Sequence, residues 1–329
     1  MVKVGVIGVG SFGEKRAAAV KACRNAALIA VADKDSDRAK SVASKLGVQH
    51  SDIAGLLSNQ EIEAIILCVP NKYHSILAVS ALNADKHVLC EKPMARNSEE
   101  AALMVAAADD RGKLLKVGSN HRYFLSVMKA YELVKSGLIG EVISFNGRIG
   151  HDGERIKSSW FWDKELSGGG TILDNGCHLL DIARWFMGDF VEACGMTSNI
   201  YWKDCPVEDT AAGVFLTHDG RMATISSSWR QLSGYFHFEV NGSDGYIAVD
   251  GRFDTHGGDN VYWQSKKEGR EIHSVNFGQI KPDSYVHELT EFFIDIRSGR
   301  EPKPSGRDGL EVIKMIDAIY KSNGNKIKI

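Results

Sequence analysis

Three glycines near the N-terminus, spaced Gly-X-Gly-X-X-Gly, follow an apolar run and open a helical stretch from Glu14 to Lys21. A second apolar run, from Leu28 to Ala32, ends at Asp33. This order of strand, glycine turn, helix, strand and acidic residue is typical of a βαβ unit that binds a dinucleotide. The first apolar run is Val4-Gly5-Val6-Ile7, and the glycines are Gly8, Gly10 and Gly13.

Each glycine has a distinct expected purpose in such a unit. Gly8 permits the tight turn, Gly10 lets the backbone approach a pyrophosphate, and Gly13 allows the helix to pack closely. Free backbone amides at the start of the helical stretch would face the phosphates, with Ser11 and Phe12 among the residues of this turn.

The acidic residue after the second strand indicates which dinucleotide is bound. The carboxylate of Asp33 can accept hydrogen bonds from both adenosine ribose hydroxyls of NAD. A 2′-phosphate in the same place would be repelled by about 4 kcal/mol at roughly 4 Å in an effective dielectric of about 20. We therefore expect NAD. Lys34 and Arg38 could soften the repulsion, so use of NADP stays open.

Length and composition bound the remaining possibilities. The 329 residues are 43% hydrophobic and 25% charged, which suits two globular domains. A net charge of −2 without a basic stripe argues against nucleic acid and favours a small-molecule partner. The apolar runs are too short to span a bilayer and no signal peptide is expected, so we predict a cytoplasmic protein without membrane contact. The six cysteines lack metal-ligand spacing, which predicts reduced thiols and no metal.

The hydrophobic pattern changes near residue 120. Before it, short apolar runs alternate with helical stretches, which predicts a doubly wound parallel sheet in an α/β domain over 1–120. After it, alternating patterns and hairpin signals at Asp219-Gly220 and Asp244-Gly245 predict a mainly antiparallel sheet. With two closing helices, over 285–297 and 308–321, this gives an α+β domain over 121–329. The strands expected in the first domain are near 3–8, 28–33, 62–69, 86–90 and 114–118.

Three further motifs hold polar residues that could act chemically. Two follow predicted parallel strands, where such sheets carry ligands: Cys68 to His74, and Cys90 to Pro93 with its lysine, Lys92. The third contains three consecutive glycines and then Asp174 and His178, which are four residues apart and therefore on one helical face. The third motif runs from Gly168 to Asp181.

Together with Asn120 and Arg122-Tyr123, these motifs occur in the order found in the Gfo/Idh/MocA family of oxidoreductases, which the chain resembles over essentially its whole length. The resemblance implies an N-terminal Rossmann domain and a C-terminal domain built on a large, open, mainly antiparallel sheet that often forms the oligomer interface. It also implies nicotinamide chemistry on polyols.

The resemblance further implies that Lys92, Asp174 and His178 are the catalytic residues. Oxidising a secondary alcohol requires a base for the hydroxyl proton, and a histidine can accept one near neutral pH. Lys92 would stabilise the developing oxyanion, and Asp174 would orient the substrate or His178. Two alternatives remain. In one, Lys92 is only a solvated partner of Glu91. In the other, Asp174 and His178 form half of a metal site, although spacing suggests no third ligand.

Aromatic and polar residues before the triple glycine suit a sugar ring, although aromatics also fill cores and interfaces. The residues expected to contact the cofactor are Gly8, Gly10, Ser11, Phe12, Gly13, Asp33, Lys34, Val69, Pro70, Asn71, His74, Glu91, Lys92 and Asn120. Those expected to contact the substrate are Lys92, Tyr123, Trp160, Asp174 and His178.

These observations predict an NAD-dependent dehydrogenase that interconverts a secondary alcohol and a ketone on a cyclic polyol, sugar or sugar derivative, such as an inositol, sugar phosphate or nucleotide sugar. One alternative is an NAD-dependent glycosidase that oxidises its substrate transiently and then eliminates the aglycone. The other is a dinucleotide-sensing regulator without turnover. The alternating strands could bury one face on helices and the other on a partner, so we predict a homodimer or homotetramer.

Overall fold

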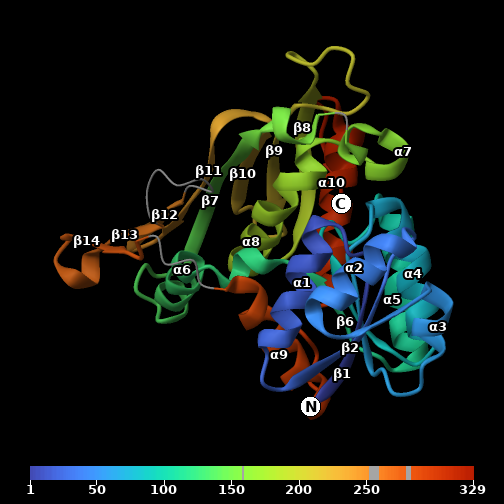
Figure 1. Ribbon diagram of the computed structural model, residues 1–329. Coiled ribbons are helices and arrows are strands. Elements are labelled where there is room, and N and C mark those ends of the chain that lie inside the picture. Colours follow the sequence, from blue (N-terminus) through green and yellow to red (C-terminus); the bar gives the residue numbers. More distant parts are fainter. Residues whose placement is uncertain (158, 252–258, 279–282) are drawn as a thin grey trace. The chain divides into compact units, whose positions relative to one another are not determined.

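The computed structural model describes residues 1–157, 159–251, 259–278 and 283–329. The chain forms two compact units (Figure 1). Unit 1 comprises Met1–Asn120 and Asp283–Leu310, and unit 2 comprises His121–Pro282 and Glu311–Ile329. None of the helices in the described part of the chain is both long enough and apolar enough to cross a membrane.

Unit 1 contains a parallel sheet of six strands in the order β3-β2-β1-β4-β5-β6. This order reverses direction at β1, which makes the sheet doubly wound, as predicted. Strands β1 and β4 are almost wholly buried, which explains their nearly continuous apolar sequence. Only β3 was not predicted, because its three residues are polar. The strands are β1 (Val2–Ile7), β2 (Ala26–Ala32), β3 (Gln49–Ser51), β4 (Ala64–Leu67), β5 (His87–Glu91) and β6 (Leu115–Gly118).

Helices pack on this sheet, and one of them comes from the far end of the chain. Leu289, Phe292 and Phe293 recur at helical spacing on α9 and join the buried cluster that contains Val2 and Val4 of β1. Figure 1 shows α9 beside α1 and β1. Residues 283–310, which the sequence pattern placed in a second domain over 121–329, therefore cluster with unit 1. The helices are α1 (Ser11–Ala22), α2 (Ser36–Leu46), α3 (Ile53–Ser58), α4 (His74–Asn83), α5 (Ser98–Arg111) and α9 (Ser284–Ser298).

Unit 2 is built on a nine-stranded sheet in the order β14-β13-β12-β11-β7-β10-β9-β8-β15. Every neighbouring pair is antiparallel except β7 with β10, so the prediction of a mainly antiparallel sheet is confirmed. The predicted turns at Asp219-Gly220 and Asp244-Gly245 join β9 to β10 and β11 to β12. The strands are β7 (Val142–Asp152), β8 (Phe190–Ser198), β9 (Thr210–Thr217), β10 (Met222–Ser228), β11 (Arg230–Gly242), β12 (Gly245–Gly251), β13 (Asn260–Ser265), β14 (Ile272–Asn276) and β15 (Ile327–Lys328).

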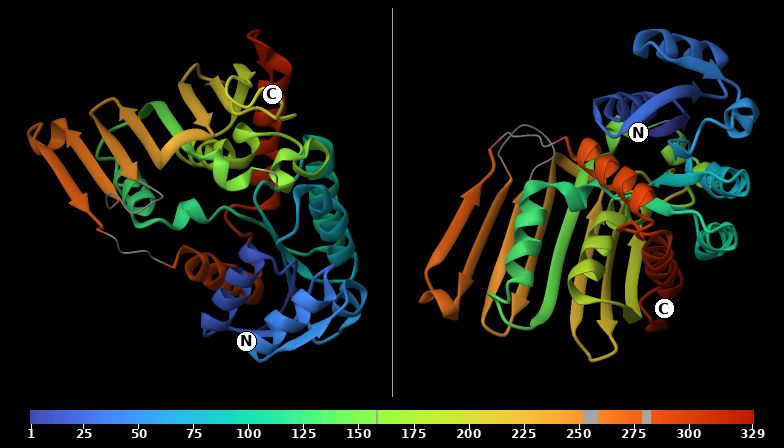
Figure 2. Two further views of the ribbon diagram at one scale, coloured as in Figure 1. Left: turned by 45° about the horizontal axis from the view of Figure 1, so that its top comes forward. Right: turned by 90° about the horizontal axis from the view of Figure 1, so that it is seen from below.

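Helices α6 (Leu125–Lys135) and α8 (Cys177–Met187) lie across one face of this sheet (Figure 2). Tyr131 of α6 stacks on Trp185 of α8, and Phe186 of α8 packs on Phe238 of β11. The short helix α7 (Lys164–Ser167) precedes the triple glycine, and the division between the units falls within α10 (Gly306–Ser322). The core of unit 2 therefore lies between α8 and the middle of the sheet.

Candidate active site

The three glycines of the N-terminal turn differ in what surrounds them. Gly8 has a φ of +85°, and a Cβ there would lie 2.3 Å from the carbonyl oxygen of Cys68. A Cβ on Gly13 would lie 1.8 Å from the carbonyl oxygen of Gly8. A Cβ on Gly10 would meet nothing within 4 Å. The packing of the protein itself requires Gly8 and Gly13, whereas glycine at position 10 leaves open space that suits a closely approaching ligand.

The N-terminus of α1, like that of α4, lacks the side-chain cap found on other helices of unit 1. Helices α2, α3 and α5 are each capped by a side chain, from Asp35, Asp52 and Asn97. Helix α1 begins after Gly10 without any side-chain cap. Its first amides are therefore available to an anion, which the helix dipole also attracts. This end of α1 fits the pyrophosphate of a dinucleotide.

Asp33 lies directly after β2, and its side chain is only 5% exposed. Its carboxylate accepts hydrogen bonds from the amides of Val9, at 2.8 Å, and Asp35, at 2.9 Å. The guanidinium of Arg38 lies 3.4 Å from Oδ1. Asp33 therefore orders the glycine turn as well as presenting an acceptor for ribose hydroxyls, and Arg38 supplies a positive charge beside it. Lys34 is exposed next to it.

The segments after β4 and β5 are linked to each other. His74, at the start of α4, is buried, and its Nδ1 donates to the carbonyl oxygen of Pro93 at 2.9 Å. Burial lowers the pKa of His74, so the ring is neutral near pH 7. His74 therefore supports the segment that carries Lys92. Lys92, like Val69 and Pro70, is half-buried.

Two other predicted cofactor contacts are held within unit 1. Asn71 is buried in the short helix Asn71–Tyr73 that follows β4. The amide nitrogen of Asn120 donates to the hydroxyl of Ser284 at 3.0 Å. At the start of α1, Ser11 and Phe12 are exposed.

In unit 2, Asp174 lies in a single π-helical turn, Ile172–Gly176, and His178 lies in the first turn of α8 that follows it. Both side chains are buried. The Oδ2 atom of Asp174 accepts a hydrogen bond from the indole of Trp229 at 3.2 Å and lies 3.4 Å from Nε2 of His151. Isolated π turns within α-helices are frequent at functional sites. The structure thus gathers the two residues in one buried segment with their own supporting contacts.

The triple glycine brings the chain close to two residues that sequence reasoning missed. A Cβ on Gly169 would lie 2.0 Å from the hydroxyl of Tyr320, and one on Gly170 would lie 2.0 Å from the carbonyl oxygen of Glu208. The Glu208 carboxylate accepts from the amides of Gly170, at 2.9 Å, and Ile172, at 3.0 Å. Burial raises the pKa of Glu208. Glu208 therefore holds the start of the π turn.

Other side chains near the start of unit 2 are paired or stacked. Arg122 donates two hydrogen bonds of 2.7 Å to the carboxylate of Asp181 on α8. Tyr123, a predicted substrate contact, is buried. Trp160, another, is half-buried and stacks on Phe161 with ring centroids 3.9 Å apart. Trp160 keeps part of its surface available to a ligand.

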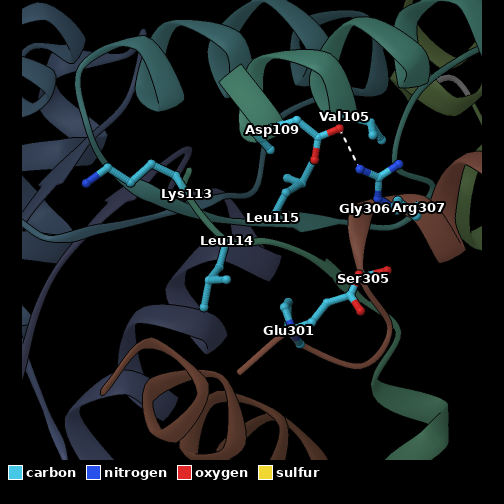
Figure 3. A pocket seen from close by; sticks show the side chains of 11 residues that line it. Val105, Asp109, Lys113, Leu114, Leu115, Glu301, Ser305, Gly306 and Arg307 are labelled. Carbon is cyan, nitrogen blue, oxygen red and sulfur yellow. Dashed lines mark hydrogen bonds and ion pairs between the residues drawn. The ribbon is translucent and has the colours of Figure 1, made fainter. Parts of the chain in front are cut away.

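A small cleft of about 130 Å³ in unit 1 is unrelated to these residues (Figure 3). It lies between the end of α5, the start of β6 and residues 301–307, and an ion pair of 2.7 Å joins Asp109 to Arg307 at its edge. Its lining includes no predicted site residue. Across the described ranges of both units, no cluster of histidine, cysteine, aspartate or glutamate could hold a metal ion.

Comparisons with known proteins match both parts of the chain. Residues 2–119 match a family model described as an oxidoreductase family with an NAD-binding Rossmann fold, and residues 127–248 match the GFO/IDH/MocA C-terminal domain. Myo-inositol 2-dehydrogenase of Thermotoga maritima is 29% identical over 98% of this chain and 96% of its own. D-xylose 1-dehydrogenase (NADP(+)) 2 of Haloferax volcanii is 28% identical over 97% and 96%. A structure of levoglucosan dehydrogenase in complex with NADH has the same fold, with a TM-score of 0.91 and 24% identity over 100% of this chain and 99% of that one.

Proposed function

The chain belongs to the Gfo/Idh/MocA family of NAD(P)-dependent sugar and polyol dehydrogenases, and we propose that it interconverts a secondary alcohol and a ketone on a cyclic polyol, sugar or sugar derivative with NAD. One observation carries the proposal: a carboxylate and an imidazole, Asp174 and His178, are buried together around a π turn that Glu208 and Trp229 hold in place. Buried groups of this kind suit proton transfer from a substrate hydroxyl.

The proposed roles of the residues follow from the charge that develops during oxidation. A bound nicotinamide would supply the hydride acceptor. His178 accepts the hydroxyl proton, and Asp174 orients the substrate or His178. Lys92 donates a hydrogen bond to the substrate oxygen as negative charge builds on it.

For the cofactor, we propose NAD with some acceptance of NADP. The Asp33 carboxylate favours two ribose hydroxyls over a phosphate. Arg38 beside it is 44% exposed and could turn toward a 2′-phosphate. The name of the Haloferax volcanii relative includes NADP(+), which supports some use of NADP by this chain.

For the substrate, the half-buried Trp160 and the polar groups of unit 2 support a ring with several hydroxyls. Two relatives that are similar over nearly their full length are named for myo-inositol and D-xylose. These names share one chemical class, and we propose that the substrate of this chain is likewise a cyclic polyhydroxy compound.

We also propose that the protein is a homodimer or homotetramer. Several large apolar side chains on strands of the unit 2 sheet are exposed, which suits burial against a second copy. They are Ile143, Val191, Met196, Met222, Tyr262 and Ile272. Light scattering at micromolar concentration should show a dimer or tetramer, and a monomer there would contradict this part of the proposal.

The reaction can be tested by absorbance at 340 nm with NAD and then NADP against inositols, free sugars, sugar phosphates and nucleotide sugars. We expect stoichiometric NADH with one group of substrates, and loss of about 10²-fold or more in turnover for Lys92→Ala and for His178→Ala. His218→Ala, which alters an exposed histidine, should have no effect. Wild-type turnover in both active-site variants would refute the assignment.

The same panel separates the alternatives. Release of an aglycone without net NADH would indicate a glycosidase. Cofactor binding without turnover on any compound would indicate a regulator.

A further inference from the structure

Three charged side chains form a buried cluster in unit 1, the Arg16 cluster: Arg16 on α1, Glu91 at the end of β5 and Glu288 on α9. Arg16 and Glu288 have no exposed surface, and Glu91 is 6% exposed. Nε of Arg16 donates to Glu91, and Nη1 donates to Glu288. One guanidinium thus joins the helix that follows the glycine turn, the strand that leads into Lys92, and a helix from the C-terminal part of the chain.

The fold makes specific room for this cluster. A Cβ on Gly118 of β6 would lie 2.8 Å from Nη2 of Arg16 and 3.2 Å from Oε2 of Glu91. The ring of Tyr285 faces the guanidinium, 4.4 Å from ring centroid to Cζ, in a cation–π contact. Burial alone would lower the pKa of Arg16, but the carboxylates of Glu288 and Glu91 raise it, so the charge is retained.

Stability does not account for such a cluster. Desolvating ionised groups is costly, and buried ion pairs can often be replaced by apolar side chains without loss of stability. A buried cluster of this kind is therefore better explained by the geometry that it imposes on its neighbours. The neighbour that matters here is Lys92, because the backbone amide of Lys92 donates to Oε2 of Glu91 at 3.3 Å.

We propose that Arg16 is a positioning residue for Lys92: it holds the Glu91 carboxylate, which in turn holds the Lys92 backbone at the end of β5. This inference rests on the proposed function, since it takes from it the role of Lys92 and the binding of cofactor at the start of α1. Arg16 lies on the same helix as that start, so one rigid element carries both the cofactor amides and the anchor of the lysine segment.

The two carboxylates offer a matched pair of variants. Glu91→Ala removes the link to Lys92 and leaves Arg16 paired with Glu288. Glu288→Ala removes an equally buried carboxylate, leaves Arg16 paired with Glu91 and keeps the link. Each variant retains one guanidinium and one carboxylate, so both avoid an unpaired buried charge. Arg16→Lys is a third variant, which keeps the charge but lacks the fork that binds two carboxylates at once.

A misplaced Lys92 should weaken transition-state stabilisation more than substrate binding. We therefore expect Glu91→Ala and Arg16→Lys to lower kcat about tenfold or more, with KM for the sugar within about threefold of wild type. Arg16→Lys should also keep Kd for NADH within about threefold, whereas Glu91 is itself an expected cofactor contact and its variant is judged on kcat. Glu91→Ala and Glu288→Ala should lower the thermal midpoint by similar amounts, but Glu288→Ala should keep kcat within about twofold of wild type. If the cluster is only structural, all three variants will lose stability and all three will keep the kcat of wild type. That result would overturn the inference.

A Lys92→Ala variant, measured in parallel, distinguishes the proposed role of Lys92 from the positioning role of Arg16. If Lys92→Ala retains wild-type turnover, the proposed role of Lys92 fails and the positioning role fails with it. If Lys92→Ala is inactive while Glu91→Ala and Arg16→Lys keep wild-type kcat, only the positioning role is refuted. Equal loss of kcat in Glu91→Ala and Glu288→Ala would also refute it, because the link to Lys92 would then be irrelevant.

Discussion

The imidazole ring of His121 lies stacked on that of His178, with ring centroids 3.6 Å apart and planes 10° from parallel. Both rings are buried. Two imidazolium charges at this separation would repel each other by about 5 kcal/mol in an effective dielectric of about 20. The stacked pair therefore favours at most one positive charge, and His121 also fixes the plane of the proposed base.

The first prediction concerns this stack. His121→Phe keeps a flat ring against His178, whereas His121→Ala removes the ring that holds its plane. We expect His121→Phe to keep kcat within about threefold of wild type and His121→Ala to lower kcat about tenfold or more, because a misoriented base accepts the proton less well. Turnover with NAD would show the difference, with His218→Ala as an exposed control. Equal kcat in the two His121 variants would mean that His121 does not position the base.

The second prediction separates two glycines of the N-terminal turn. Gly10→Ala places a methyl group in open space, so the thermal midpoint should stay within about 2 °C while NADH affinity falls about tenfold or more. Gly13→Ala forces a methyl group onto the Gly8 carbonyl, which should lower the free energy of unfolding by about 2–3 kcal/mol. Thermal unfolding and NADH fluorescence titration would measure both effects. Unchanged NADH affinity in Gly10→Ala would place the phosphates elsewhere.

The third prediction concerns cofactor choice. Asp33→Asn keeps an acceptor for the Val9 amide but removes the charge that would oppose a 2′-phosphate, and it weakens one contact of Arg38, which stays paired with Asp35. The ratio of kcat/KM with NADP to that with NAD should rise about tenfold or more. Asp37→Asn, whose side chain is 94% exposed, is the nearby control. If the ratio does not change, the ribose lies away from Asp33.

The fourth prediction concerns acid stability. Burial, with help from Lys113, lowers the pKa of His87 to about 4, and its Nδ1 accepts a hydrogen bond from the Leu114 amide at 3.0 Å. An unfolded histidine takes up its proton near pH 6.5, so the unfolded state binds more protons between about pH 4 and 6.5. The stabilisation is complete above that window and is lost as pH falls through it.

His87→Asn preserves an acceptor for the Leu114 amide without the titration. The loss of unfolding free energy between pH 7 and pH 4.5 should then be smaller than in wild type by about 1–2 kcal/mol, a value reduced to allow for the partial exposure of the ring. Urea unfolding at the two pH values would measure it. Equal losses in both proteins would assign the acid sensitivity to other groups.

The parallel strands of unit 1 were predictable because strands buried on both faces are apolar almost throughout. The place of α9 was not, because an apolar stripe predicts a helix with a buried face but does not specify the sheet on which that face packs. Asp174 and His178 belong to a recognisable local motif, whereas Glu208 and His121 depend on contacts between residues far apart in the chain. Arg16 could be noticed in the sequence only as a charged residue on a helical face whose other buried residues are glycine, alanine and valine.

A π-helical turn contains one residue more than a turn of α-helix. The turn at Ile172–Gly176 is therefore sensitive to the deletion of a single residue. Deleting a single residue there would let α-helix continue through the segment and turn the Asp174 side chain by about 100° relative to α8. The Asp174 carboxylate would then no longer reach Trp229 and His151, and the glycines before the turn would lose their close fit against Tyr320 and Glu208. The length of this one turn therefore sets both the direction of the carboxylate proposed to orient the substrate and the packing of the triple glycine.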